Sequence, residues 1–321
     1  MALSPNEAAA VLSKSLSLIE KTRGRVEQID EDAFPTLSSC YARDVLNRAL
    51  LALAQPESLK AMNSEVLYNR LVQLQDLVDD VEASSSDRIS WPLVSYCDTI
   101  WEKLFEKEKI TPKLFYTVTT EHNYKIVSFS NKLSLRISSL LSSAEIREIT
   151  RDEKIYSLHL ASLEDANLPL YANIGHEFGH ALYDAMEDSI LRLLVDEFLT
   201  VFRSLFADVG TGDPDQVKRR RRRVTSVIIA FAKELFADLV GAMVGGPAFL
   251  LSLYEMGWGG TKSTWSIRLS VREQEIRAYP SDNFRLNCLK QSIGLDAFEK
   301  NAVEAFAFLA TPVLKEMSTY V

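Results

Sequence analysis

Apolar residues recur at every third or fourth position through most of the first hundred residues, which is the spacing of amphipathic helices. Leu67, Leu71, Leu74 and Val78 mark one such apolar face. A stripe of this kind more often packs into a core than it forms a binding groove. The pattern predicts helices over residues 5–30, 36–55, 63–83 and 90–108.

After Pro112 the pattern changes to short segments that are rich in β-branched and aromatic residues. These segments predict strands over residues 115–118, 124–129, 133–137 and 155–160. The last of them would either act as an edge strand that pairs with an extended substrate or only cover a site behind it. A closing amphipathic helix is expected over residues 295–317.

The predicted fold class is therefore α+β, mainly α. A helical N-terminal region over residues 1–112 is followed by a second domain over residues 113–321, with a small β-sheet and further helices. A hydrophobic content of 47% in 321 residues is ample for a packed core.

Composition narrows the cellular setting. The chain has no apolar run near eighteen residues, so we expect no membrane span, and its first residues lack the pattern of a secretion signal. Three widely spaced cysteines, Cys40, Cys97 and Cys288, lie in apolar segments and are interpreted as reduced core residues. A cytoplasmic location is the expectation that follows.

The strongest chemical signal is at residues 175–180, which read Gly-His-Glu-Phe-Gly-His inside an apolar segment. Side chains four positions apart lie on one face of a helix, so His176 and His180 can reach the same metal ion. Neutral imidazoles are good zinc ligands. Glu177 stands beside them and is a candidate general base that takes a proton from water.

Three known arrangements would add a third zinc ligand to the two histidines. A metzincin is excluded, because Tyr183 and Met186 occupy the positions of its glycine and third histidine. An aspzincin would use an aspartate in a Gly-Thr-x-Asp segment, and Asp213 ends such a segment, so this alternative stays open. The third arrangement takes a glutamate from a second helix, with an aspartate one turn later, and Glu234 and Asp238 fit it.

The second helix is expected to begin near residues 213–214 and to end by residues 245–247. Glu234 and Asp238 fall in its apolar half, where carboxylates need a cation or a hydrogen-bond donor. Solvated carboxylates on the polar edge of a core helix are the alternative interpretation. The nearby histidine pair favours the metal.

With these motifs the chain resembles the gluzincin zinc metallopeptidases, and among them the soluble relatives of the CAAX-processing and heat-shock membrane proteases. The resemblance covers roughly residues 155–290. In that branch a His-Pro segment with a following arginine often comes later. Here Tyr279 stands in place of the histidine, followed by Pro280 and, further on, Arg285.

The resemblance implies a zincin-like fold and a Zn²⁺ ion bound by His176, His180 and Glu234, with Asp238 holding the free N–H of a histidine ligand. It implies hydrolysis of peptide bonds, with endopeptidase activity favoured over exopeptidase activity. Glu177 would be the general base. Tyr279 is the first candidate for a donor to the oxyanion, ahead of Tyr254 and Arg285.

The predicted partners are a peptide or protein substrate and a protein that binds the N-terminal helices. Residues 218–223 are six consecutive cations in a chain of net charge −8. An internal salt-bridge or docking role is favoured for them over nucleic-acid binding, because no aromatic residues interleave the run. His122 and His159 are expected to be surface or sheet histidines.

A second function class stays open beside the peptidase. The chain would then be a non-catalytic protein that binds a partner through its N-terminal helices and holds a structural zinc ion. Glu177 argues for the enzyme, because a structural metal needs ligands but no general base.

Overall fold

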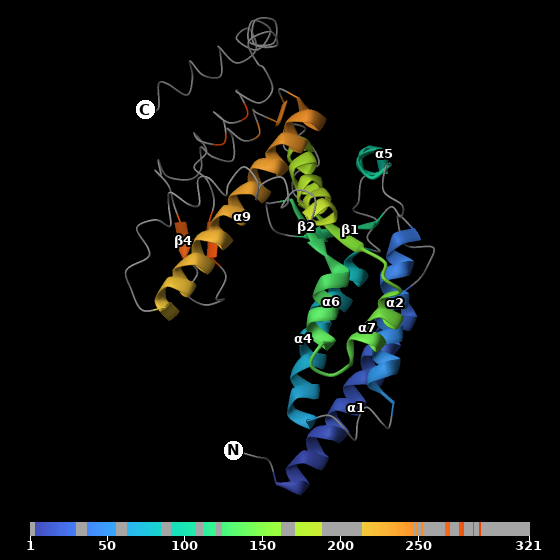
Figure 1. The fold of residues 1–321 in the computed structure, drawn as a ribbon. Helices are drawn as coiled ribbons and strands as arrows, with labels where there is room; N and C mark the ends of the chain where they lie inside the picture. The colour runs from blue at the N-terminus through green and yellow to red at the C-terminus, as the bar shows by residue number, and fades with distance from the viewer. Residues whose placement is uncertain are drawn as a thin grey trace, which may run out of the picture. The chain divides into compact units, whose positions relative to one another are not determined.

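The computed structural model shows a mainly helical chain with a three-stranded sheet (Figure 1). Contacts divide the chain into two compact units, Met1–Ala166 and Asn167–Val321. The residues that the structure describes are 4–29, 37–55, 63–84, 91–106, 112–119, 124–161, 171–187, 214–246, 248–249, 252, 267–269, 276–278, 285 and 289.

The four predicted N-terminal helices are confirmed to within a few residues. They are α1 (Pro5–Gln28), α2 (Leu37–Leu53), α4 (Ser64–Ala83) and α5 (Trp91–Leu104). Local chemistry fixes where they begin: the Ser4 hydroxyl accepts from the backbone N–H of Glu7 while the Glu7 carboxylate accepts from Ser4, a reciprocal capping box. Asn63 caps α4 in a similar way, by accepting two backbone N–H groups.

Helices α1, α2 and α4 pack on one another around a core of buried aliphatic side chains. At one edge of this core, Arg25 of α1 reaches across to α4. Its Nε donates to Glu82 Oε1 at 2.9 Å and its Nη2 donates to Glu82 Oε2 at 2.6 Å, with a further bond to Asp79. The two-point pairing of guanidinium and carboxylate fixes the register of these two helices.

The sheet has the order β1-β3-β2. Strand β1 (Lys113–Thr119) pairs parallel with β3 (Ile155–Ala161), and β2 (Lys125–Ser128) pairs antiparallel with the other side of β3. Three of the four predicted strands are thereby confirmed. The expectation that β3 is an edge strand is wrong: both of its sides are hydrogen-bonded within the sheet, so its main chain cannot pair with an extended substrate.

Both faces of the sheet are covered, which explains why β1 and β3 read as nearly continuous apolar runs. On one face Phe115 packs against Phe129, with ring centroids 5.5 Å apart, and joins the core of α1, α2 and α4. On the other face Tyr116 donates its hydroxyl to Asp98 of α5 at 2.5 Å. Tyr156 lies edge-on to Trp101, also of α5.

The predicted strand over residues 133–137 is wrong, because these residues end helix α6 (Phe129–Ile137). Ser128 caps this helix by accepting from the backbone N–H of Asn131. Phe129, Leu133 and Ile137 are all fully buried at spacings of four, the helical period. A five-residue window was too short to distinguish this period from that of a strand. Helix α7 (Ser143–Thr150) follows.

In the second unit, residues 171–187 are helical, and α9 (Pro214–Gly245) is a second helix of 32 residues that matches its predicted bounds. Gly246, with φ of +54°, stops it in the left-handed conformation that suits glycine. Strands β4 (Ile267–Leu269) and β5 (Ile276–Ala278) form an antiparallel pair, and β5 contacts α9. The helix expected over 295–317 lies outside the described residues.

The sheet shares its core with the N-terminal helices, so the compact units divide after Ala166. The predicted domains divide after residue 112, where the sequence pattern changes from helical to strand-like, and that division stays a prediction. None of the described helices is both long enough and apolar enough to cross a membrane.

His159 of β3 lies on the face of the sheet that packs against α4. Its Nε2 is 3.1 Å from the Ser157 hydroxyl and 3.9 Å from Asp80 Oδ1. Burial, reinforced by the positive charges of Lys132 and Lys125, lowers the pKa of His159 to about 4. The ring is therefore neutral in the folded protein at pH 7, as expected for a sheet histidine.

This burial predicts an acid-dependent loss of stability. Below pH 6.5 His159 becomes protonated in the unfolded chain, whereas in the folded chain it stays neutral down to about pH 4. The free energy of unfolding therefore decreases as the pH falls from 6.5 to about 4. In the His159→Gln variant this contribution is absent. We expect the difference in unfolding free energy between the two proteins to change by about 1–3 kcal/mol from pH 7 to pH 4. Urea unfolding at several pH values measures it, and parallel curves would contradict it.

Candidate metal centre

The site is built where helical residues 171–187 cross α9, both in the second unit. The two backbones touch: a Cβ atom placed on Gly179 would lie 2.5 Å from Cα of Ala237, and one on Gly175 would lie 3.2 Å from Cα of Gly241. Real Cβ atoms do not approach other atoms to 2.5 Å, so Gly179 is required at this crossing. The spacing of four places both glycines on one helix face.

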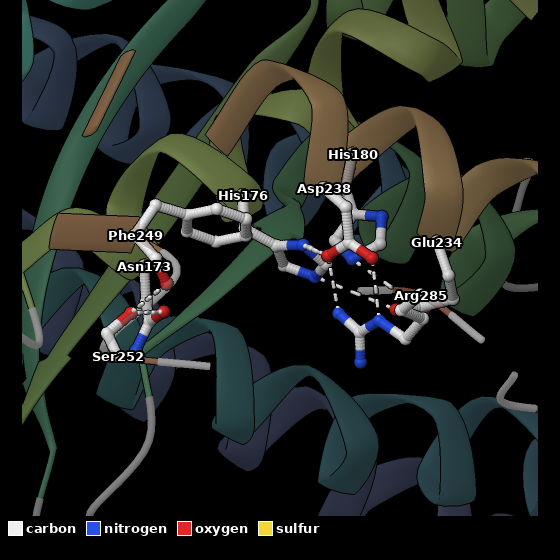
Figure 2. Close-up of polar contacts among 8 residues, drawn as sticks. All are labelled: Asn173, His176, His180, Glu234, Asp238, Phe249, Ser252 and Arg285. Atoms are coloured by element: carbon white, nitrogen blue, oxygen red, sulfur yellow. Dashed lines mark hydrogen bonds and ion pairs between the residues drawn. The ribbon is translucent and has the colours of Figure 1, made fainter. Parts of the chain in front are cut away.

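This close crossing brings three candidate ligands together. His176 and His180 come from residues 171–187 and Glu234 comes from α9 (Figure 2). Nε2 of His176 is 3.6 Å from Glu234 Oε2, and Nε2 of His180 is 3.8 Å from Glu234 Oε1. One ligand atom from each of the three residues lies within 4.8 Å of the other two, so the group could hold a metal ion.

His176 is fixed on two sides. Its Nδ1 is 2.9 Å from Asp238 Oδ1, and its ring stacks on Phe249 with centroids 6.2 Å apart and planes 17° from parallel. The Asp238 carboxylate also accepts from Arg285, so it is ionised and Nδ1 of His176 must be the donor. In the neutral ring a proton on Nδ1 leaves the lone pair on Nε2, the atom that faces Glu234 at 3.6 Å.

His180 is held differently. Its Nδ1 is buried and has no hydrogen-bond partner among the described residues. Burial, which disfavours the charged form of the ring, is the main cause that lowers the pKa of His180 to about 2, and the nearby ammonium group of Lys233 acts in the same direction. The ring is therefore an uncharged imidazole at neutral pH, the form that binds metals.

Burial also perturbs the two carboxylates of α9. It raises the pKa of Glu234, because the charged form loses its hydration. Burial alone would raise the pKa of Asp238 too, but hydrogen bonds from Arg285 and His176 outweigh it and lower that pKa. Asp238 is thus already paired, whereas a cation would stabilise the charged form of Glu234.

The residues fit a tetrahedral ion by a simple geometric test. Ligands at 2.0–2.1 Å from zinc are separated by about 3.3 Å in a tetrahedron. The separations of 3.6 and 3.8 Å between Glu234 and the two histidines exceed this by a few tenths of an ångström. Side-chain rotations would close that difference without moving the helices.

A salt bridge also joins the helix over residues 171–187 to α9, next to the candidate ligands. Lys233 Nζ of α9 donates to Asp184 Oδ1 at 2.6 Å, and the same ammonium group lies 5.9 Å from the centre of the Tyr183 ring. Both side chains of the pair are about one-third exposed, at 35% and 32%. Solvent screening therefore makes this a modest contribution to the crossing.

The other predicted site residues have mixed outcomes. Glu177 is half-buried and follows His176 directly in its helix. Arg285 was a lesser candidate for the donor to the oxyanion. Its Nε and Nη2 atoms donate hydrogen bonds to the Asp238 carboxylate. Tyr279, Tyr254 and Asp213 lie outside the described residues.

The basic run over 218–223 is part of α9, where Lys218 and Arg219 are exposed.

Sequence reasoning missed three contacts of the site. One is the pairing of Arg285 with Asp238, for which a sequence separation of 47 gave no signal. Another is the stacking of Phe249 on His176. The third is a buried hydrogen bond from the Ser252 hydroxyl to the side-chain oxygen of Asn173. The glycines at 175 and 179 did carry a readable signal, since their spacing of four marks a helix face that admits a close neighbour.

We compared the chain with protein-family models, with curated proteins and with solved structures, and none of the three comparisons gave a match. The functional interpretation therefore rests on the residues and their geometry.

The close crossing predicts that Gly179→Ala weakens both the fold and the site. The added methyl group would collide with the backbone of Ala237 and separate the helices. We expect a loss of about 1–3 kcal/mol in unfolding free energy, as for other overpacked cores, together with reduced zinc affinity. Urea unfolding and zinc titration measure the two effects.

The matched control is Gly24→Ala in α1, where no atom lies within 4 Å of the added Cβ. Alanine has the higher helix propensity, so this variant should be unchanged or up to about 1 kcal/mol more stable. A Gly179→Ala protein as stable as wild type would show that the helices can move apart freely.

Proposed function

We propose that the protein is a zinc-dependent metallopeptidase that hydrolyses peptide bonds, with endopeptidase activity favoured. The observation that carries the proposal is the group of His176, His180 and Glu234, whose ligand atoms lie within 4.8 Å of one another. Two neutral imidazoles and one carboxylate are the ligand set of catalytic zinc sites of the thermolysin type, which keep a fourth position open.

Each residue has a role in this proposal. His176, His180 and Glu234 hold the ion, and Asp238 accepts from Nδ1 of His176 and so keeps Nε2 available. When bound, Zn²⁺ would polarise the scissile carbonyl group and lower the pKa of a water ligand to about 7. The buried setting of the histidines supports this chemistry, because electrostatic interactions are stronger where water is excluded.

Glu177 is the proposed general base. Its carboxylate takes one proton from the attacking water as the oxygen bonds to the carbonyl carbon. It then gives that proton to the leaving amine when the C–N bond breaks, so the carboxylate is regenerated. Tyr279 remains the proposed donor to the oxyanion.

The remaining assignments belong to the same proposal. Residues 113–321 would form a zincin-like metallopeptidase domain of the gluzincin type, and the helical region over 1–112 would bind a protein partner. We also propose that the protein acts in the cytoplasm. The exposed cations Lys218 and Arg219 on α9 are consistent with docking of an acidic protein segment.

The role of Glu177 is tested by Glu177→Gln. The amide cannot accept the proton, so we expect cleavage of a casein or quenched-peptide substrate to fall by at least about 100-fold, the lower range for loss of a general base. Zinc content should stay at the wild-type value, because Glu177 is not a ligand. Metal analysis and peptidase assays measure both.

Glu187→Gln is the matched control, since Glu187 is exposed and lies in the same described helix ten residues later. It should keep both zinc and activity. A Glu177→Gln protein with wild-type cleavage would refute the mechanism. A wild-type protein that binds zinc tightly and cleaves no peptide would favour the non-catalytic, partner-binding alternative.

The ligand assignment is tested by metal analysis of His180→Ala and Glu234→Ala. Each removes one ligand atom, so we expect both variants to lose bound zinc during dialysis that leaves wild type loaded. His159→Gln is the control histidine and should retain the ion. If Glu234→Ala keeps zinc while Asp213→Ala loses it, the aspzincin arrangement replaces the one proposed.

A further inference from the structure

Arg285 contacts the metal centre from outside the two helices that carry the candidate ligands. Its Nε donates to Asp238 Oδ2 at 2.6 Å and its Nη2 donates to Oδ1 at 2.5 Å (Figure 2). Two parallel bonds of this kind fix the plane of a carboxylate as well as its position. Oδ1 is also the atom that meets Nδ1 of His176 at 2.9 Å.

Burial makes this pairing far stronger than a surface salt bridge. The side chain of Asp238 is 0% exposed and that of Arg285 is 12% exposed. A carboxylate buried without a partner is strongly disfavoured, and removal of one member of a buried ion pair leaves the other charge uncompensated. Asp238 therefore depends on Arg285 to remain both charged and correctly oriented.

The three side chains form a relay that ends at the ligand group. Arg285 orients Asp238, and Asp238 accepts from Nδ1 of His176, so Nε2 of that ring points at Glu234, 3.6 Å away. Partners of this kind, one step removed from the metal, change its affinity by about 10- to 100-fold when they are lost. The relay thus links metal affinity to Arg285, which is not itself one of the three candidate ligands.

Arg285 also belongs to a later part of the chain than the ligands. It lies 47 residues beyond Asp238 and follows β5, which itself contacts α9. Whatever favours the docking of Arg285 on Asp238 must favour the oriented form of His176. Linkage requires the reverse to hold equally, so that a bound ion stabilises the docking of this part of the chain.

We propose that Arg285 is a positioning residue, which sets zinc affinity through Asp238 and couples occupancy of the metal site to the docking of β5 and Arg285 on α9. This inference rests on the proposed metal centre and adds to it a residue and a coupling that the ligand set alone does not require.

The first test is a double-mutant cycle on zinc affinity, measured by competition with a chelating dye. Arg285→Ala and Asp238→Asn should each weaken zinc binding by about 10- to 100-fold, and Arg285→Lys should restore part of the loss because it keeps the charge. The double variant should be little weaker than either single variant, because both act through one relay. Additive losses, or an Arg285→Ala protein with wild-type affinity, would overturn the proposal.

Arg25→Ala is the matched control. Arg25 makes the same two-point pairing with Glu82, but in the first unit. It should lower stability without changing zinc affinity, which separates the relay from the general loss of a two-point ion pair.

The second test measures the effect of bound zinc on the docking of β5 and Arg285. Hydrogen exchange of the peptide that carries β5 and Arg285 should slow when zinc is added to wild type, and the slowing should be lost in Arg285→Ala. Equal protection by zinc in both proteins would overturn the coupling. If wild type binds no zinc, the proposed metal centre fails and this inference fails with it. If wild type binds zinc but the cycle is additive, only the inference fails.

Discussion

Backbone contact between the two helices of the candidate metal centre determines what the rest of the site can do. At Gly179 the helix over residues 171–187 lies so near Ala237 that no side chain fits between them. The short reach of histidine and glutamate side chains then suffices to place His176, His180 and Glu234 within one coordination sphere. With ordinary residues at the contact, helix axes separate to 8–10 Å or more, and the ligand atoms would separate with them.

This contact has an electrostatic cost, because it buries ionisable groups in a region with few polar partners. The two buried carboxylates differ in how their charge is stabilised. Asp238 receives donors on both of its oxygens, from Arg285 and His176, which keeps it charged without any metal. Glu234 has the raised pKa of a buried carboxylate, and its two oxygens face Nε2 of His176 and Nε2 of His180. One carboxylate is thus satisfied by the protein, and the other is suited to a cation.

The sequence was sufficient for the parts of the fold that repeat over many residues. Helices α1, α2, α4 and α5 could be located within a few residues because each carries several turns of apolar period. The segment over 133–137 could not, because five residues contain too little of either period, and only the burial of Phe129 with Leu133 identifies a helix. The central position of β3 in its sheet could not be predicted either, since strand order depends on pairing between segments that are far apart in the sequence.

The same distinction applies to the candidate site. His176 and His180 were found from their motif, and Glu234 and Asp238 were found by testing known arrangements of a third ligand; each pair has the spacing of one helix turn. That the two pairs meet is a tertiary fact, which required the glycine contact. Arg285 was recognised as a residue of interest, but its partner could not be read from a linear separation of 47 residues.

The charges of the centre suit the proposed divalent ion when Glu177 is counted together with Glu234. The charges of Arg285 and Asp238 cancel each other, and an imidazole that binds a metal ion contributes no charge. Glu234 then supplies one negative charge to the ligand set, so a divalent cation leaves one unit of positive charge at the centre. The carboxylate of Glu177, one residue from His176, is the group in the same helix that can balance it. A carboxylate beside such a cation is favoured in its ionised form, the form that a general base requires before it can accept a proton.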